Sequence, residues 1–408
     1  MKILMVNKFF YIKGGSETYY FALKKLLEEN GHTVIDFSMQ DEKNFPSNYE
    51  KYFVENINYN SSKNMYNQVI AGLKIIYSME AKKKFEKLVI DTKPDIVHLH
   101  IFQHQLSPSI LDVIKKYNLP TVYTAHDLKM LCLNYKMMHH GHICEECKNQ
   151  RYYKCAQNKC VKDSLAKSCI NVVEGYFHKW KHSYDVIDKI ITPSNFYKKK
   201  FEEFGIERNR VEHIPNFLDT EKPIINVKDN CEKYYLYFGR LSEEKGVFTL
   251  IRAFEQLDVK LFIVGTGPVG EKVKEYILKN NIQNVQILGF MSGQSLKDIV
   301  GNAKAVILPS EWYENGPYSA IEALQLGRPI IGADIGGIPE LINENGFLFT
   351  SGSSRELTQI INKIEELPKD QYEILKQKSI SNFNEIYTRE IHYKKIMKTY
   401  EEVLAKYK

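Results

Sequence analysis

Short apolar runs alternate with longer amphipathic segments along most of this chain. Most of the runs are apolar at consecutive positions, which is typical of parallel sheets covered by helices on both faces. The segment 16–30, which Gly31 follows, has the length and spacing of one such helix. The pattern predicts two α/β domains, each with its own parallel sheet. The expected strands are 2–7, 33–39, 94–100, 119–126 and 187–194 in the first half, and 234–241, 260–265, 285–290, 305–310 and 329–334 in the second.

A polar stretch separates the two sets of strands. Residues 214–232 contain two prolines and no strong period. A chain of 408 residues is also too long for one ordinary core. We therefore expect a first domain at 1–213 and a second at 214–385. The tail at 386–408 has helical spacing and is expected to pack on another element.

Charge and hydropathy bound the location and partners of the protein. No apolar run approaches the roughly 18 residues that span a bilayer, and the first residues are interpreted as a strand, not a signal peptide. We expect a cytoplasmic protein. Residues 1–213 hold 32 Lys and Arg against 24 Asp and Glu, with basic clusters at 82–87 and 198–200. These clusters fit solvated helix faces, or contact with an anionic membrane surface or an anionic lipid-linked substrate. No nucleic-acid-binding module is recognised.

Two glycine-rich turns follow expected strands. Gly14 and Gly15 precede Ser16, which fits either a helix cap or a close approach of backbone amides to a phosphate or sugar. Gly265, Gly267 and Gly270 have the spacing GxGxxG. A dinucleotide site also needs an acidic residue at the end of the next strand, but that strand ends in Gly289 and Phe290. A turn beside a mononucleotide fits the second motif as well as a dinucleotide site does.

A pair of cations follows the first strand of the second half. Arg240 ends this strand, and Lys245 lies five residues later, before Gly246 and a helix. A guanidinium fork and an ammonium group at the carboxyl end of one strand can converge on one anion, for which a diphosphate is the obvious candidate. The alternative is an exposed turn whose charges pair among themselves.

Two carboxylates, Glu314 and Glu322, flank an expected helix start. Gly316 is expected near the N-cap and Pro317 at the first helical position. Glu314 can then accept hydrogen bonds from sugar hydroxyls, and Glu322 can take the two hydroxyls of a ribose. The unpaired amides at the positive end of this helix belong to Tyr318 and Ser319.

Taken together, these motifs resemble the GT-B-fold retaining glycosyltransferases of glycosyltransferase family 4. The resemblance covers essentially the whole chain. It implies two Rossmann-like domains that face a central cleft, with the tail helix crossing back to the first domain. The residues that carry it are GGSE (14–17), TAHD (124–127), IPN (214–216), GRLSEEKG (239–246), GTGP (265–268), LGF (288–290) and the run PSEWYENGPYSAIEALQLGRPIIGADIGGIPELI (309–342).

The resemblance also implies roles for individual residues. Arg240 and Lys245 would bind the donor diphosphate without a metal, so no cofactor is needed for catalysis. Glu314 would orient the transferred sugar and Glu322 the ribose. His126 would stand over the donor sugar, although from the residues alone it also fits a structural histidine. The further donor-binding residues are Gly15, Gly265, Gly267, Gly289, Gly316, Pro317, Tyr318 and Ser319.

The implied activity is transfer of a sugar from a UDP- or GDP-sugar to a growing glycan. A polyprenyl-diphosphate-linked acceptor would place it in the biosynthesis of capsule, O-antigen or exopolysaccharide. Many members have Phe-Gly where this chain has Gly316 and Pro317, so sugar contacts are expected to shift to Tyr318 and Ser319. Two alternatives stay open, a nucleotide-sugar epimerase of the same fold and a non-catalytic glycan-binding protein.

A cysteine-rich insertion interrupts the alternation at 127–165. Its four thiols at 144–160 fit a structural zinc site that orders a loop without a core. Unliganded thiols are the alternative, because the gaps match no standard zinc finger. A disulfide framework is disfavoured in the cytoplasm. The candidate ligands are Cys144, Cys147, Cys155 and Cys160.

Overall fold

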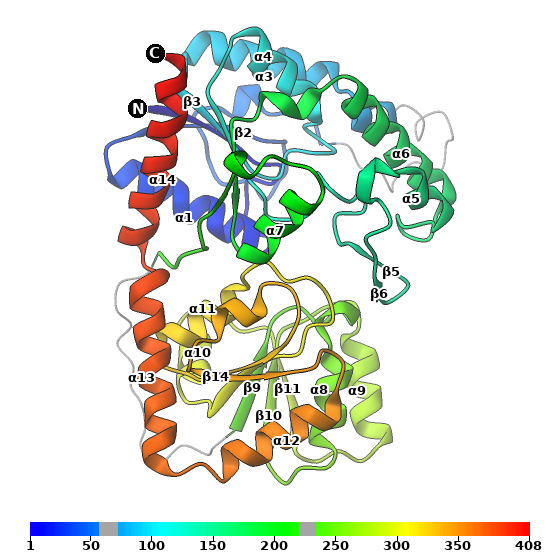
Figure 1. Cartoon of the computed structure of the whole chain (residues 1–408), viewed down its shortest axis with the longest axis vertical. Coiled ribbons are helices and arrows are strands. Elements are labelled where there is room, and N and C mark those ends of the chain that lie inside the picture. The colour runs from blue at the N-terminus through cyan, green and yellow to red at the C-terminus, as the bar shows by residue number, and fades with distance from the viewer. Residues whose placement is uncertain (57–71, 220–233) are drawn as a thin grey trace.

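Two six-stranded parallel sheets form the framework of the chain, one in each lobe (Figure 1). The computed structural model describes residues 1–56, 72–219 and 234–408. The first sheet has the order β2-β1-β3-β4-β7-β8 and the second the order β11-β10-β9-β12-β13-β14. This confirms the predicted α/β architecture of two Rossmann-like sheets. Most of the predicted boundary at 214–232 lies outside the described residues.

The first lobe contains β1 (Lys2–Val6), α1 (Gly15–Glu29), β2 (Thr33–Phe37), α3 (Met79–Thr92), β3 (Ile96–Leu99), α4 (Leu111–Lys116), β4 (Thr121–Thr124), β7 (Lys189–Thr192), α7 (Asn195–Glu203) and β8 (Val211–His213). The insertion between β4 and β7 contains β5 (Met138–His139), β6 (His142–Ile143), α5 (Tyr153–Gln157) and α6 (Leu165–Trp180). It projects to one side of the lobe, so that β5 and β6 point toward the second lobe (Figure 1).

The second lobe contains β9 (Tyr234–Phe238), α8 (Val247–Phe254), β10 (Lys260–Val264), α9 (Gly270–Lys279), β11 (Val285–Gly289), α10 (Gly293–Gly301), β12 (Ala305–Leu308), α11 (Tyr318–Gln325), β13 (Ile330–Ala333), β14 (Gly346–Phe349), α12 (Ser354–Glu365) and α13 (Lys369–Ile386). The last helix, α14 (Arg389–Leu404), returns to the first lobe (Figure 1). None of the described helices is long and apolar enough to cross a membrane.

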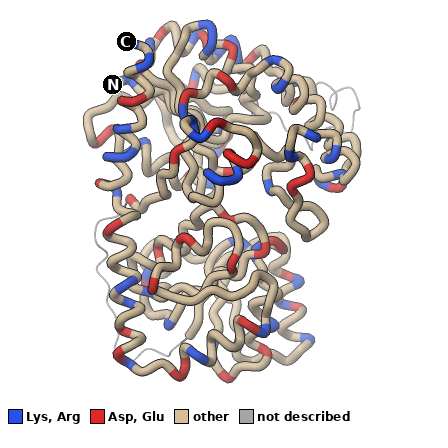
Figure 2. Tube along the Cα trace, in the orientation of Figure 1, with Lys and Arg blue, Asp and Glu red and all other residues tan. Residues whose placement is uncertain are grey.

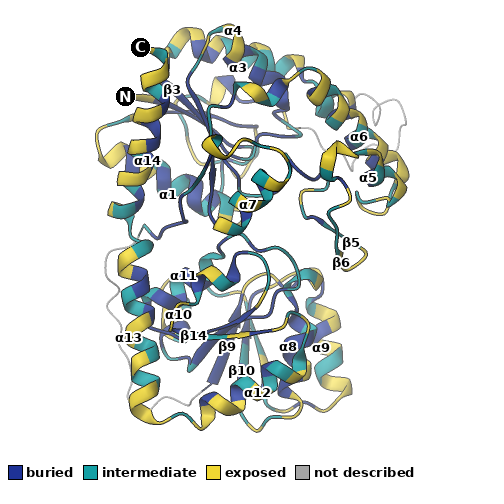
Figure 3. Ribbon diagram, viewed as in Figure 1, coloured by how far each residue is buried: buried dark blue, intermediate teal, exposed yellow. Residues whose placement is uncertain are grey.

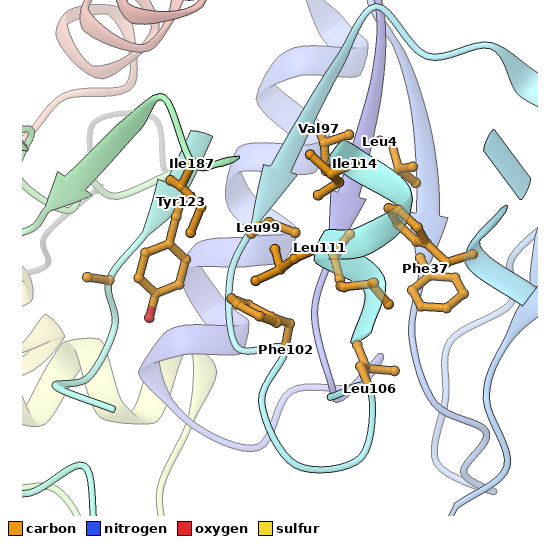
Figure 4. Packing of buried hydrophobic residues seen from close by; sticks show 14 of the residues in the cluster. Leu4, Phe37, Val97, Leu99, Phe102, Leu106, Leu111, Ile114, Tyr123 and Ile187 are labelled. Carbon is orange, nitrogen blue, oxygen red and sulfur yellow. The ribbon is translucent and has the colours of Figure 1, made fainter. Parts of the chain in front are cut away.

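Both faces of the first sheet are buried, as the consecutive apolar runs predicted. Leu4 pairs in register with Ile35 and Val97 and packs toward α3 and α4 (Figure 4). Ile3, on the opposite face, belongs to the cluster formed with α1 and α14. Figure 3 shows both sheets as buried layers beneath partly exposed helices. Loops follow the carboxyl ends of both sets of strands and approach the other lobe.

The last helix, α14, packs against α1 and the first sheet, so the two ends of the chain are in contact. Ile396, Tyr400 and Val403 are buried against α1 and the first sheet. The Tyr400 hydroxyl lies 2.7 Å from Nδ1 of His98, and Arg389 forms ion pairs with Glu29 and Asp219. The predicted crossing of the tail helix is confirmed.

Three local expectations were wrong or incomplete. The N-cap of α1 is Gly14 and no side chain caps it, so Ser16 does not act as the cap. Pro317 has an extended conformation with ψ 135° and is the N-cap of α11, so the helix begins one residue later than expected. The edge strands β8 and β14 were not predicted; β8 has three residues of which only Val211 is apolar, whereas residues 347–349 of β14 form a short apolar run that was missed.

Candidate active site

Glycines allow three turns at the carboxyl end of the second sheet to touch one another. A Cβ atom at Gly246 would lie 1.8 Å from the carbonyl oxygen of Pro309, and one at Gly265 would lie 1.9 Å from that of Gly239. Gly267 approaches Leu241 in the same way, at 2.2 Å. Gly289, which ends β11, accepts a hydrogen bond from the Gly265 amide at 2.7 Å. The GxGxxG spacing thus packs the turns around Arg240.

Glu314 and Lys245 form an ion pair in the space between these turns. The Nζ atom of Lys245 lies 2.5 Å from Oε1 of Glu314, and Ser310 donates a hydrogen bond of 2.6 Å to the same oxygen. Glu314 is buried, with 6% exposure. Burial acts to raise its pKa, but the charge and hydrogen bond of Lys245 and the hydrogen bond of Ser310 hold the pKa below its ordinary value. The carboxylate is therefore ionised and held in place before any ligand binds.

The Gly-Gly turn after β13 holds the loop that carries Glu314. Gly336 has φ +62°, and a Cβ atom there would lie 2.5 Å from the backbone nitrogen of Glu314. The Gly337 amide donates to the Glu314 carbonyl oxygen at 2.8 Å. A Cβ atom at Gly337 would also lie 2.8 Å from that of Ser194, at the N-cap of α7 in the first lobe. The turn thus packs between the Glu314 loop and the first lobe.

The same loop also hydrogen-bonds directly to the first lobe. Asn315 donates to the carbonyl oxygen of Ala125 at 2.8 Å, beside His126. Asn216 donates to the Gly316 carbonyl oxygen at 2.9 Å. Glu340 accepts hydrogen bonds from the first amides of α7, at 2.7 and 2.5 Å. Asn315 and Glu340 were not singled out from the sequence, because only the folded chain reveals their partners.

Gly15 and Tyr318 meet across the two lobes. A Cβ atom at Gly15 would lie 3.4 Å from Cδ2 of Tyr318, which begins α11. Among the described residues the buried hydroxyl of Tyr318 has no hydrogen-bond partner. Ser319 follows in the same first turn of α11, whose amides lack partners within the helix. The GGSE turn therefore lies against the start of α11.

Glu322 lies inside α11 and is half-buried. Burial raises its pKa to about 7, and Lys297 opposes this effect. No ion pair of Glu322 is recorded in the part of the chain that the structure describes. Its carboxylate is therefore short of polar partners, which suits a group that receives hydrogen bonds from a ligand.

Arg240, just after β9, interacts electrostatically with a lysine of the first lobe. Arg240 is exposed and directly follows Gly239. Burial lowers the pKa of Lys13, and the positive charge of Arg240 lowers it further while Glu17 opposes the change. Lys13 directly precedes the GGSE turn and was missed by the sequence analysis, because a single lysine in a turn carries no signal. An anion bound near both cations would lower this repulsion.

Two family profiles match this sequence. Glycosyltransferase Family 4 matches residues 13–222, more than half of the 408 residues, and Glycosyl transferases group 1 matches residues 219–381. The chain is a family 4 glycosyltransferase. The family confirms the resemblance that the motifs carried.

Relatives of this glycosyltransferase occur among curated proteins and solved structures. An uncharacterized 42.6 kDa protein in the cps region of Klebsiella pneumoniae is 25% identical over 84% of this chain and 87% of its own length. Lipopolysaccharide 1,2-N-acetylglucosaminetransferase of Salmonella typhimurium is 32% identical over 38% of this chain and 46% of its own length. The structure of Anabaena HepE in complex with UDP-glucose is 18% identical, with a TM-score of 0.63, and covers 98% of this chain and 100% of that one. The structural likeness identifies the fold as GT-B.

His126 of this glycosyltransferase belongs to a stack of histidines in the first lobe. Its Nε2 atom lies 3.1 Å from Nδ1 of His100, whose ring stacks on His98 at 4.3 Å. The ring of Tyr19 meets His126 edge-on at 5.1 Å. Burial lowers the pKa of His126 to about 3, so the imidazole is neutral at physiological pH. His126 can therefore exchange hydrogen bonds with a ligand, but it cannot serve as a charged group.

The cysteine-rich insertion brings five thiols to one cavity. The candidate ligands Cys144, Cys147, Cys155 and Cys160 line it together with Cys132, which the prediction had left out of the ligand set. Cys132 donates a hydrogen bond of 3.1 Å to Oδ1 of Asn134. A second arrangement lies at the edge of this cavity. This arrangement consists of His139, Cys144 and Glu146. In residues 1–56, 72–219 and 234–408 it is the only set of three potential metal ligands whose ligand atoms all lie within 4.8 Å of one another.

Proposed function

We propose that this glycosyltransferase transfers a hexose-type sugar from a nucleotide diphosphate donor to a glycan, with retention of the anomeric configuration. The observation that carries the proposal is the ion pair of Lys245 with buried Glu314, whose loop also hydrogen-bonds to the first lobe through Asn315. An ionised carboxylate and two cations at the carboxyl ends of neighbouring strands match a sugar joined to a diphosphate.

The proposed chemistry depends on positioning and charge. Arg240 and Lys245 bind the diphosphate and stabilise the negative charge that develops when it leaves. Glu314 accepts hydrogen bonds from hydroxyls of the transferred sugar, and Glu322 accepts them from the ribose. Neutral His126 hydrogen-bonds to the sugar from the first lobe. Attack of the acceptor hydroxyl on the face that the diphosphate leaves gives retention, and the leaving phosphate takes the proton.

The relatives support a choice of donor and pathway. A UDP-sugar is the first choice because HepE, which shares the fold, is described with UDP-glucose, and a GDP-sugar is the second. The cps-region protein and the lipopolysaccharide transferase support a role in surface polysaccharide biosynthesis. The proposed acceptor is a polyprenyl-diphosphate-linked glycan.

A donor screen followed by product analysis tests this function. We expect one UDP- or GDP-sugar to raise the melting temperature and to release its nucleotide when an acceptor is present. Arg240→Ala is expected to abolish the release, whereas Arg355→Ala, at an exposed arginine of α12, retains it. An anomeric proton signal of the inverted product would contradict retention. Conversion of the donor without an acceptor would identify an epimerase, and glycan binding without any donor binding would identify a non-catalytic protein.

We further propose that α6 brings the protein to the anionic membrane that holds this acceptor. Three of the seven lysines in the clusters at 82–87 and 198–200 form ion pairs, as in Lys82–Asp112 at 3.2 Å and Lys200–Glu145 at 2.9 Å. In contrast, α6 exposes an apolar stripe at helical spacing, and residues 148–182 carry eight Lys and Arg against two acidic residues. Figure 2 shows blue segments along this part of the insertion. The stripe consists of Leu165, Val173, Tyr176 and Trp180, at 53%, 54%, 37% and 79% exposure.

Replacing Trp180 with Ala is expected to weaken binding to vesicles by several-fold. Burying this exposed indole at the lipid interface favours association, and nearby lysines attract anionic headgroups. Cosedimentation with vesicles of phosphatidylglycerol and phosphatidylcholine measures the effect. Leu278→Ala, which removes an apolar side chain of 76% exposure from α9, is the matched control and should bind normally. Equal binding of wild type and Trp180→Ala, or equal binding to purely zwitterionic vesicles, would contradict the proposal.

A further inference from the structure

The cysteine-rich insertion has little apolar core of its own. Its β5 and β6 contain two residues each and α5 contains five. The buried hydrophobic cluster of this region consists of Leu133, Cys147 and Cys155, with a few partly buried neighbours. Two of these three residues are cysteines, so the small core is built around sulfur. A segment of this kind needs an additional crosslink to hold one conformation.

We propose that Cys144, Cys147, Cys155 and Cys160 bind one Zn²⁺ ion as thiolates. All four line the same cavity, and soft thiolate ligands in a tetrahedral set are the usual structural site for zinc. No three of their sulfur atoms lie within 4.8 Å of one another in the described residues, so binding would draw the thiolates together around the ion. Cys132 lines this cavity too, but its thiol already donates to Asn134, which assigns it to the surrounding shell. Binding releases the four thiol protons to solvent and consumes no oxidant or reductant.

The insertion also touches the donor site at two places. Glu145, between Cys144 and Cys147, accepts a hydrogen bond of 2.8 Å from the hydroxyl of Tyr313, the residue before Glu314. Lys136 pairs with Glu244, the residue before Lys245, at 3.2 Å. The zinc site would therefore hold the insertion against the two residues that flank the ion pair. This second step depends on the proposed donor site, whereas zinc binding does not.

Metal analysis of the purified full chain tests the ligand set. We expect one zinc per chain in reducing buffer, and at least a tenfold loss of affinity for zinc on replacing any one of the four ligands with Ser. Cys132→Ser and Cys169→Ser retain the metal; Cys169 is an exposed cysteine of α6 and serves as the matched control. Loss of zinc in Cys132→Ser would overturn the ligand assignment. Loss in His139→Ala or Glu146→Gln would favour the second set.

Cobalt substitution keeps the test independent of variant folding. Wild-type protein reconstituted with Co²⁺ is expected to show the intense visible bands of a tetrahedral thiolate site. Absence of stoichiometric zinc or cobalt from the wild type after dialysis would overturn the proposal. Visible absorbance from an iron–sulfur cluster in the purified protein would replace zinc with that cluster and overturn it equally.

The coupling to the donor site has its own test. Glu145→Gln is expected to raise KM for the donor several-fold while the zinc content stays at one per chain. Glu146→Gln, at the exposed neighbouring position, is the matched control and should leave both unchanged. An unchanged KM in Glu145→Gln would reject the coupling but leave the zinc site standing. A wild type without zinc would reject the metal site but leave the donor site standing.

Discussion

Replacing Lys245 with Met is expected to lower kcat/KM for sugar transfer by about 10²- to 10³-fold, the usual effect of removing one preorganised group that stabilises developing charge. Met fills a similar volume but carries no charge. The substitution removes the ammonium 2.5 Å from Glu314 and leaves this buried carboxylate with Ser310 as a remaining hydrogen-bond donor. We therefore also expect a stability loss of about 1–3 kcal/mol, less than for a fully buried pair because the Lys245 side chain is 23% exposed.

A second substitution separates these two effects. Glu314→Gln in the Lys245→Met background removes the unpaired charge, so we expect it to restore most of the lost stability but none of the activity. Urea denaturation measures the change in the free energy of unfolding, and initial rates with the donor found by screening measure the change in kcat/KM. Transfer close to wild type in Lys245→Met would contradict the proposed role. Recovery of activity in the double variant would show that Lys245→Met loses activity because the Glu314 charge is left unpaired, and not because the diphosphate loses an ammonium partner.

The repeated sheet architecture could be predicted because the buried strands leave a local signal. Runs such as 3–6 and 305–308 are apolar at every position, which requires cover on both faces. Most residues of the proposed donor site could also be singled out, since Lys245, Glu314 and Glu322 lie in motifs with distinctive spacing. The role of the glycines was less accessible. Gly265 and Gly267 pack turn against turn, which is a property of the fold and not of the motif alone.

The contacts between the lobes could not be predicted, because they join residues far apart in the chain. Asn315 meets Ala125 across 190 positions, and Tyr313 meets Glu145 across 168. A single polar side chain in a loop does not reveal such a partner. The same limit applies to Lys13, whose electrostatic interaction with Arg240 joins residues far apart in the chain. The exposed apolar stripe of α6 could not be predicted for another reason. Its apolar spacing is that of any buried helix, and only the fold shows which face remains exposed.

Replacing Glu322 with Gln is expected to stabilise the empty protein at pH 8 while weakening donor binding by at least tenfold. Burial raises the pKa of Glu322 to about 7, above the value near 4.3 of an unfolded chain. The stabilising effect of the protonated form is fully present below pH 4.3 and is lost as the pH rises through 7. At pH 8 the ionised carboxylate therefore costs up to about 3 kcal/mol of folding free energy, which the neutral amide avoids.

Thermal denaturation of the variant and the wild type at pH 5 and pH 8, with and without the donor, measures both parts of this prediction. The gain in melting temperature from Glu322→Gln should be larger at pH 8 than at pH 5, because the wild-type carboxylate is mostly protonated at the lower pH. The donor should stabilise the wild type more than the variant, since a carboxylate accepts hydrogen bonds from two hydroxyls better than an amide does. Glu271→Gln, on α9 of the same lobe, is the control and should change neither quantity. A destabilised variant with unchanged donor affinity would show that Glu322 serves the packing of α11 and not the ribose.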